Sequence, residues 1–277
     1  MNYKQRTLLL GAVFLGATAS AAIVFQDDFS TGTAADAGYF HFGTTGSNLA
    51  TDNSGGTLDY AYTSSAANRS GVYKTFSGQT LAVGEILTLS FSIDGRTLRS
   101  GENHAFRWAI GNLGDPSAIT VSGGGPFGSD LDSATPLDGG TREMYQFSAS
   151  TGATNGFGQY VTGSSSPVHN AGGSATAITS FSGPASIGTT GDATVVLSIT
   201  RTATGFEFDQ TAFGSSTSGT LVGGTDFFNA LAFSMNNAGD YDFSLSDVTV
   251  SVIPEPSTLL LLGISLISAL ALRRRNA

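Results

Sequence analysis

Hydrophobic and polar residues alternate one by one over residues 86–93 (ILTLSFSI), with Leu, Leu, Phe and Ile at the odd positions and hydroxyl residues between them. A period of two places the apolar side chains on one face of a β-strand and the hydroxyls on the other. Similar stretches, bounded by Gly, Asn, Asp and Ser, lie at residues 23–29, 57–62, 71–76, 104–111, 143–149, 194–201, 205–211, 228–235 and 241–252. The pattern therefore predicts about ten strands and no long helix within this part of the chain.

Two pairs of these stretches have the spacing of β-hairpins. Residues 194–201 and 205–211 are separated by a short turn, and residues 228–235 and 241–252 by the polar segment 236–240. Asn, Asp and Gly in such segments tolerate the positive φ angles that tight turns require. We therefore expect each pair to form neighbouring antiparallel strands.

The last stretch, 241–252, changes parity along its length. Phe243 and Leu245 are odd-numbered, whereas Val248 and the two valines after it are even-numbered. An extra residue in one strand of a pair shifts all later side chains to the other face. A β-bulge near Asp247 would therefore bring both sets of apolar residues to the core.

The number of strands predicts an all-β fold: a two-sheet antiparallel β-sandwich of the jelly-roll type over residues 22–253. Residues 112–142 and 150–190 are rich in Gly, Ser and Pro and are expected to be long loops. The chain has no cysteine, so a hydrophobic core or a bound metal must stabilise it without disulfides. The Asp27-Asp28-Phe29 motif in the first strand and the closing DVTVSV at 247–252 resemble laminin-G-like or concanavalin-like jelly rolls, which implies that the first and last strands pair.

The N-terminal segment has the three parts of a secretory signal peptide. Lys4 and Arg6 precede an apolar run from Leu8 to Ala17, which is followed by the small residues at 19–21. About ten apolar residues reach only half of the roughly 30 Å hydrocarbon core of a bilayer. We therefore expect residues 1–21 to direct the chain to a Sec-type export machinery and to be cleaved after Ala21.

The C-terminal segment, 254–277, also has three parts: Pro254-Glu255-Pro256, an uncharged apolar run at 258–272 and a cluster of three arginines, Arg273, Arg274 and Arg275. The run would form a short membrane helix with the arginines on the cytoplasmic side. This arrangement resembles the PEP-CTERM sorting signal. The resemblance implies processing by an integral-membrane exosortase in a Gram-negative bacterium, after transient tethering in the inner membrane, and release to the cell envelope or extracellular matrix.

The segment between the two signals is acidic. Without the charges of both terminal segments, 7 basic and 20 acidic residues remain, a net charge of −13. Binding to nucleic acid needs clustered Lys and Arg, so the charge excludes a nucleic-acid partner. It is compatible with cation binding or with solubility alone.

The strongest enzymatic candidate is the pair Glu207 and Asp209. Laminarinase-like jelly-roll glycosidases carry a Glu-x-Asp-x-x-Glu motif, and the sequence is similar to it only in part, because Ala212 stands where the general acid belongs. The three histidines are far apart in sequence, and no Gly-x-Ser-x-Gly motif occurs. We therefore predict no catalytic site.

Calcium is the most plausible cofactor, because hard cations bind carboxylate and carbonyl oxygens. Asp130, Asp132 and Asp138 lie in one predicted loop and are the first candidate ligands; solvent-exposed turn aspartates are the alternative. Further aspartates lie near both ends of the domain, at 27–28 and 240–247.

A sugar-binding site would use an exposed aromatic ring against a pyranose, beside polar side chains that bind the hydroxyls. Trp108 shares a strand face with Phe106 and is expected in the core. Tyr145, Phe157 and Tyr160 lie in or near the predicted loops and are the candidate glycan contacts. Three functions remain open: a non-catalytic protein associated with extracellular polysaccharide, a purely structural or adhesive surface protein, and a glycan hydrolase.

Overall fold

The computed structural model describes residues 20–30, 39–43, 50–52, 56–62, 69–98, 105–114, 143–150, 156–162, 174–182, 187–188, 190–236 and 241–254. Fifteen strands are assigned within these ranges. They are β1 (Ala22–Asp27), β2 (Phe40–Gly43), β3 (Ala50–Asp52), β4 (Leu58–Tyr62), β5 (Arg69–Thr80), β6 (Ile86–Leu98), β7 (Ala105–Asn112), β8 (Glu143–Ser150), β9 (Phe157–Thr162), β10 (Ser174–Ser182), β11 (Thr190–Arg201), β12 (Gly205–Ala212), β13 (Ser215–Val222), β14 (Phe227–Asn236) and β15 (Tyr241–Ile253).

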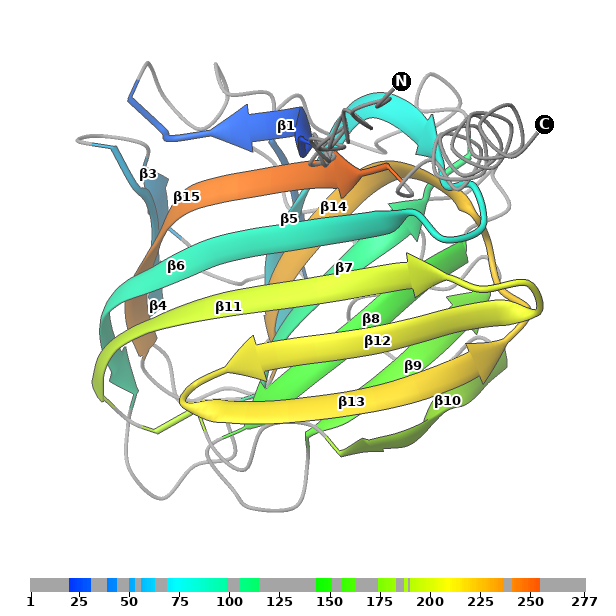
Figure 1. Ribbon diagram of the computed structural model, residues 1–277. Coiled ribbons are helices and arrows are strands. Elements are labelled where there is room, and N and C mark those ends of the chain that lie inside the picture. The colour runs from blue at the N-terminus through cyan, green and yellow to red at the C-terminus, as the bar shows by residue number, and fades with distance from the viewer. Residues whose placement is uncertain are drawn as a thin grey trace, which may run out of the picture.

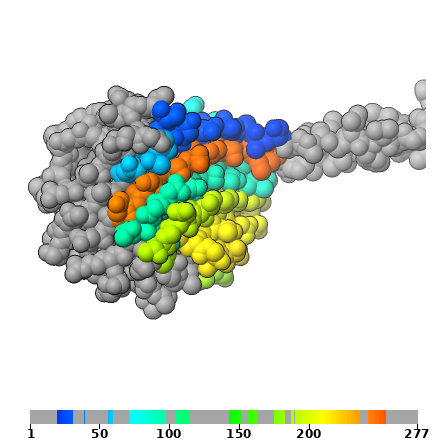
Figure 2. Space-filling view, turned by 90° about the vertical axis from the view of Figure 1, so that its left-hand side faces the viewer, coloured from blue at the N-terminus to red at the C-terminus, as the bar shows by residue number. Residues whose placement is uncertain are grey.

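The strands form two antiparallel layers (Figure 1). Sheet A has the order β3-β4-β15-β6-β11-β12-β13, and β1 also pairs with β15. Sheet B has the order β2-β5-β14-β7-β8-β9-β10, and a single pair, Thr179 opposite Thr220, joins the two sheets along one edge. Figure 2 shows β1, β15, β6, β11 and β12 of sheet A side by side. The predicted two-sheet sandwich is confirmed.

The core lies between the sheets and is rich in aromatic rings. All four odd-numbered apolar residues of 87–93 are at most 2% exposed, as the alternation predicted. Phe91 contacts rings from the opposite sheet, with centroids 4.9 Å from Phe233 and 6.1 Å from Trp108. Trp108 is completely buried, so its predicted place in the core is confirmed.

The first and last strands pair, as the resemblance implied, with Ala22 opposite Val252 and Asp27 opposite Val248. The carboxylate of Asp27 accepts a hydrogen bond from the backbone N–H of Phe29, 2.9 Å away, and Phe29 is buried against Tyr39. The aspartate therefore forms a local turn contact at the end of β1, beside the buried Phe29.

The bulge in β15 is confirmed. Asp247 has φ of 52°, and the pairing of β15 with β6 shifts its register between Ser246 and Thr249. Phe243 and Val248, on either side of the bulge, are both buried. The extra residue reconciles the two parities.

The first predicted hairpin is confirmed, because β11 and β12 pair along their length from Val195–Ala212 to Arg201–Phe206. The second is wrong. β14 belongs to sheet B, between β5 and β7, whereas β15 belongs to sheet A. A short polar connection fits a crossing between two sheets as well as a hairpin, so spacing alone does not choose between them.

The prediction of one long loop over 150–190 is also wrong, because β9 and β10 lie within it. Of the other predicted loop, 112–142, the residues 115–142 lie outside the described part of the chain.

Candidate functional site

The two faces of sheet B differ in character. The inner face carries the large aromatic side chains of the core, including Trp108, Phe147 and Phe233. The outer face carries the alternate residues Ala230, Ala232, Ser234, Arg107, Ala109, Met144, Gln146, Ser148, Phe157, Gln159 and Val161. Among the described strands, none packs against this outer face. Most side chains at its centre are small, and Ala109, Gln146 and Ser148 are completely buried.

Strand register brings the polar residues of this face together. Arg107 stands directly opposite both Ser234 and Ser148, and Ser148 stands opposite Phe157. One step along the strands, Gln146 lies between Ala109 and Gln159. Because neighbouring strands are about 4.8 Å apart, each row of four residues spans about 14 Å. We call Arg107, Gln146, Ser148, Phe157 and Gln159 the sheet B polar cluster.

Two polar groups of the cluster are buried without hydrogen-bond partners. Gln146 is completely buried; its Oε1 accepts a hydrogen bond from Gln159 Nε2, but its own Nε2 has no partner. Ser148 is also completely buried, and its Oγ has no partner. An unpaired buried polar group destabilises the folded state by about 1–3 kcal/mol. Such groups are rare in folded proteins, and a functional role is one explanation for them, beside strain or a bound water or ion.

An aromatic ring and a cation lie beside these groups. The guanidinium carbon of Arg107 is 5.3 Å from the centroid of the half-buried Phe157 ring. A cation over a ring face contributes about 0.5–2 kcal/mol, depending on solvent exposure. The cluster therefore combines a flat ring, a fixed positive charge and several hydrogen-bonding groups.

Gly111, on the same face, is required by close packing. A Cβ built at this position would lie 2.2 Å from the carbonyl oxygen of Glu143 on the neighbouring strand β8. Any larger residue would push β7 and β8 apart. The glycine keeps the two strands that carry most of the cluster in register.

The three predicted glycan contacts have different positions. Phe157 is part of the cluster. Tyr145 is completely buried in the core, and its hydroxyl donates to the carbonyl of Thr225 at 2.7 Å. Tyr160 is half-buried on the inner face, and its hydroxyl donates to Glu143 Oε1 at 2.8 Å. The completely buried ring of Tyr145 has no open face to stack on a sugar.

Burial raises the pKa of Tyr145 above its ordinary value of 10, and the neighbouring Tyr160 adds to the shift. Burial is also the main cause of the raised pKa of Tyr160, and its hydrogen bond to Glu143 acts in the same direction. Both phenols therefore stay protonated at physiological pH and serve as donors rather than as bases.

The predicted calcium ligands Asp130, Asp132 and Asp138 lie outside the described residues. Within the described part of the chain, no group of three or more His, Asp or Glu side chains is arranged to hold a metal ion. Asp28 accepts a hydrogen bond from the backbone of Ser30, which is a local turn contact.

Glu207 and Asp209 are exposed on the outer face of sheet A, on the far side of the core from the sheet B polar cluster. Ala212 is completely buried and points inward. Two open hollows of about 380 and 280 Å³ flank Asp209, lined mainly by Ser and Thr side chains of β10, β11, β12 and β13. Glu207 and Asp209 line the second hollow together, but the motif's third carboxylate, the general acid, is replaced by the buried Ala212.

Pro254 directly follows β15 and is exposed; the remaining sorting residues, Glu255, Pro256 and the arginines at 273–275, lie outside the described residues. In comparison with known families, residues 252–275 match the PEP-CTERM protein-sorting motif. The chain carries a PEP-CTERM sorting signal. This signal marks an exported protein that an exosortase processes. In the part that the structure describes, no helix is long and apolar enough to span a membrane.

Several solved structures are similar to this chain at low sequence identity. An endo-1,3-β-glucanase from Streptomyces sioyaensis has 12% identity and a TM-score of 0.46, over 84% of this chain and 97% of the glucanase. A Bauhinia forficata lectin in complex with GalNAc has 11% identity and a TM-score of 0.43, over 85% and 100% of the two chains. The alginate lyase Aly36B has 14% identity and a TM-score of 0.43, over 83% and 96%. No curated protein matches the sequence. Similarity at this level is too weak to indicate a function.

Proposed function

We propose that the chain is a non-catalytic protein of the cell envelope or extracellular matrix, whose β-sandwich binds a polysaccharide along the outer face of sheet B. The observation that carries the proposal is the pair of buried, unpartnered groups, Gln146 Nε2 and Ser148 Oγ, beside the Arg107–Phe157 contact. Sugar hydroxyls can both donate and accept hydrogen bonds, so they can satisfy an amide N–H and a serine hydroxyl together. The phenylalanine ring supplies an apolar face for a pyranose.

The charge of the domain favours a neutral polysaccharide. Residues 22–253 carry a net charge of −13, which repels polymers rich in carboxylate or sulfate. Arg107 already contacts the Phe157 ring, and its single positive charge is small beside the net negative charge of the domain. Because Gln146 and Ser148 are completely buried, a ligand can reach them only if this face opens. We therefore expect binding to be slow.

The route to the matrix follows the two terminal signals. Residues 1–21 direct export through the Sec-type machinery, residues 254–277 hold the precursor in the inner membrane, and the exosortase releases the sandwich domain, 22–253. Calcium bound by Asp130, Asp132 and Asp138 remains a prediction about the loop that contains them.

The test is electrophoresis of the full-length protein in detergent, through gels that contain a neutral β-1,3-glucan or, in parallel, alginate. We expect the neutral polymer to retard the protein, and Phe157→Ala and Gln146→Leu to reduce its affinity about tenfold, or about 1.4 kcal/mol. Asp209→Asn, on the opposite sheet, is the control and should bind like the wild type. Repeating the gels with a chelator tests the calcium prediction.

Each other outcome identifies a different error. No retardation by either polymer would refute glycan binding and favour a structural or adhesive role. Loss of binding in Asp209→Asn alone would place the site on sheet A. Release of reducing ends from either polymer would show a hydrolase.

A further inference from the structure

Both ends of the sandwich domain leave the fold at the same place. Ala22, at the expected signal-peptide cleavage site, is opposite Val252 in the β1–β15 pair. Ile253, the last residue of β15, is opposite Ile86, the first residue of β6. The turns β5–β6, β11–β12 and β13–β14 lie at this same end (Figure 1). We call the end formed by these three turns and both termini the terminal end.

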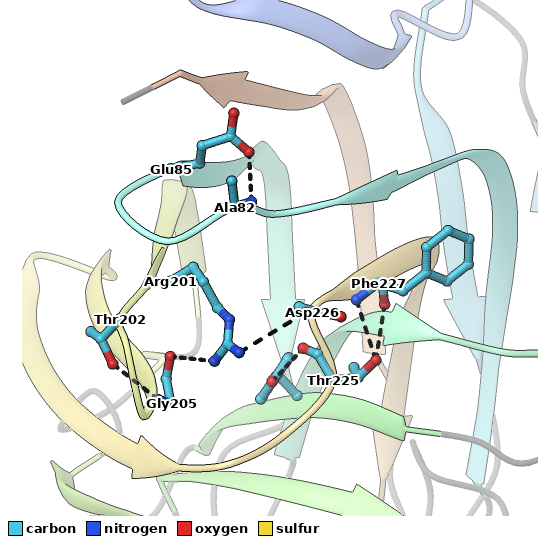
Figure 3. A network of polar contacts seen from close by, with 9 residues as sticks. Ala82, Glu85, Arg201, Thr202, Gly205, Thr225, Asp226 and Phe227 are labelled. Carbon is cyan, nitrogen blue, oxygen red and sulfur yellow. Dashed lines mark hydrogen bonds and ion pairs between the residues drawn. The ribbon is translucent and has the colours of Figure 1, made fainter. Parts of the chain in front are cut away.

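Backbone hydrogen bonds lock the three turns to one another. Gly84 N–H donates to the carbonyl of Arg201 at 2.7 Å, and Arg201 N–H donates to the carbonyl of Glu85 at 3.0 Å. Gly223 and Leu81 donate in the same way to neighbouring turns, at 2.9 Å each. Figure 3 shows the accompanying side-chain contacts: Glu85 accepts from Ala82 N–H, and Arg201 bridges Gly205 and Asp226. The terminal end is therefore a rigid surface.

Exposed apolar side chains concentrate on this surface. Among the described residues, four large apolar side chains are exposed, and three of them belong to the terminal end: Val222 at 85%, Ile23 at 62% and Val83 at 50%. Val83 lies in the β5–β6 turn, and Val222 is the last residue of β13, directly before the β13–β14 turn. Burying such side chains would stabilise the protein by about 25 cal/mol for each Å² of apolar surface removed from water.

The distance from this surface to the membrane is limited by the chain itself. Only four residues, 254–257, separate β15 from the apolar run 258–272. At no more than about 3.6 Å each, they span at most about 14 Å. When the apolar run is in the bilayer, the end of β15 is therefore at most about 14 Å from the hydrocarbon core, whereas each headgroup layer is about 5–8 Å thick.

We propose that, before processing, the terminal end rests on the lipid bilayer and that Val83 and Val222 contact its interface. This inference rests on the tethering step of the proposed function. The charged side chains at this end, Glu85, Arg201 and Asp226, sum to one negative charge, so they do not attract the surface of an anionic leaflet. The tether supplies a high effective concentration, and the apolar side chains make the contact.

The absence of cysteine in the chain allows single-site labelling. The full-length protein is reconstituted in vesicles of phosphatidylcholine and phosphatidylethanolamine whose headgroups carry a quencher. Val83→Cys, Val222→Cys and Thr190→Cys each receive an environment-sensitive fluorophore. Thr190, at the opposite end of β11, is ten residues from the terminal end, or about 33 Å. We expect at least twofold lower emission from the two valine positions and no change at Thr190.

Insertion of ten Gly and Ser residues between Ser257 and Thr258 provides the matched control. Fourteen flexible residues extend about 20 Å on average, so quenching at Val83 should fall by half or more. Unquenched valine positions in vesicle-bound protein would overturn the inference and leave the tether intact. Failure of the protein to float with the vesicles would instead refute the tether. Quenching that appears only after exosortase is added would identify the enzyme, rather than lipid, as the contact, and would also overturn the inference.

Discussion

Replacing Ser148 by alanine tests the candidate site through protein stability alone. The Ser148 hydroxyl is completely buried and has no hydrogen-bond partner. Burying an unpaired polar group destabilises the folded state by about 1–3 kcal/mol, and removing the group removes this cost. The loss of one oxygen atom leaves little empty volume in the core. We therefore expect Ser148→Ala to raise the free energy of unfolding by about 1 kcal/mol. At this size of domain, that raises the melting temperature by about 2–4 °C.

The measurement is urea unfolding followed by the fluorescence of Trp108, the single tryptophan, which is buried in the core. The matched control is Thr225→Val, because Thr225 is 7% exposed and its Oγ1 accepts a hydrogen bond from Phe227 N–H at 3.3 Å. This isosteric substitution removes the hydrogen bond between Thr225 and Phe227 and should lower the free energy of unfolding by about 0.5–1.5 kcal/mol. Most core substitutions destabilise, so opposite signs for the two variants would be a specific result.

A loss of stability in Ser148→Ala of about 1 kcal/mol or more would refute the reasoning, because it would mean that the hydroxyl is paired in the folded protein. A gain of stability together with weaker binding to the neutral glucan would be the expected pattern. Binding sites commonly retain groups that are unfavourable until the ligand is bound.

Three further predictions concern the fold. Phe91→Ala should lower the free energy of unfolding by about 3–5 kcal/mol, measured in urea, because the ring is 1% exposed; a loss below 1 kcal/mol would contradict its central position. Asp247→Val should destabilise by about 1–2 kcal/mol and Asp247→Gly should not, since the bulge requires a positive φ; equal melting temperatures for the two would count against the bulge. Burial raises the pKa of Asp27 above 3.8, although the backbone hydrogen bond from Phe29 and the charge of Lys74 oppose the shift. The folded state therefore binds this proton more tightly than the unfolded state does. As a result, the contribution of Asp27 to the free energy of unfolding falls as the pH rises from 3.8 through the raised pKa. The melting temperature of Asp27→Asn relative to wild type should therefore be higher at pH 7 than at pH 3.5, and a constant difference would contradict the shift.

The sequence predicted those strands in which large apolar residues alternate with polar ones, since that pattern directly reflects one buried face. β6 and the bulge at Asp247 were predicted for this reason. β10 and β13 were missed, because Ser, Thr, Gly and Ala dominate both strands and few of their side chains are large. Their positions depend on pairing with neighbours that alternation does not reveal.

The candidate site was predictable only in part. Phe157 was recognised as an aromatic residue in or near a predicted loop, whereas no sequence signal singled out Arg107. Gln146 and Ser148 look like the ordinary solvent side of a strand in the sequence, and only the structure shows that they are buried. Tyr145 has the reverse problem: an aromatic near a predicted loop proved to be a core residue, because its parity within β8 matches Phe147.

The order of the strands also determines whether membrane contact at the terminal end and polysaccharide binding on sheet B can occur in the same molecule. The terminal signals join β1 and β15, which both belong to sheet A, whereas the sheet B polar cluster lies on the far side of the core. A membrane contact at the terminal end meets the sandwich at the ends of its strands, and the polar cluster lies along a face. Tethering therefore does not press that face against the membrane, and release by the exosortase removes no residue of it. A chain that ended in β14 instead would have placed the tether beside Ser234, within the candidate site itself.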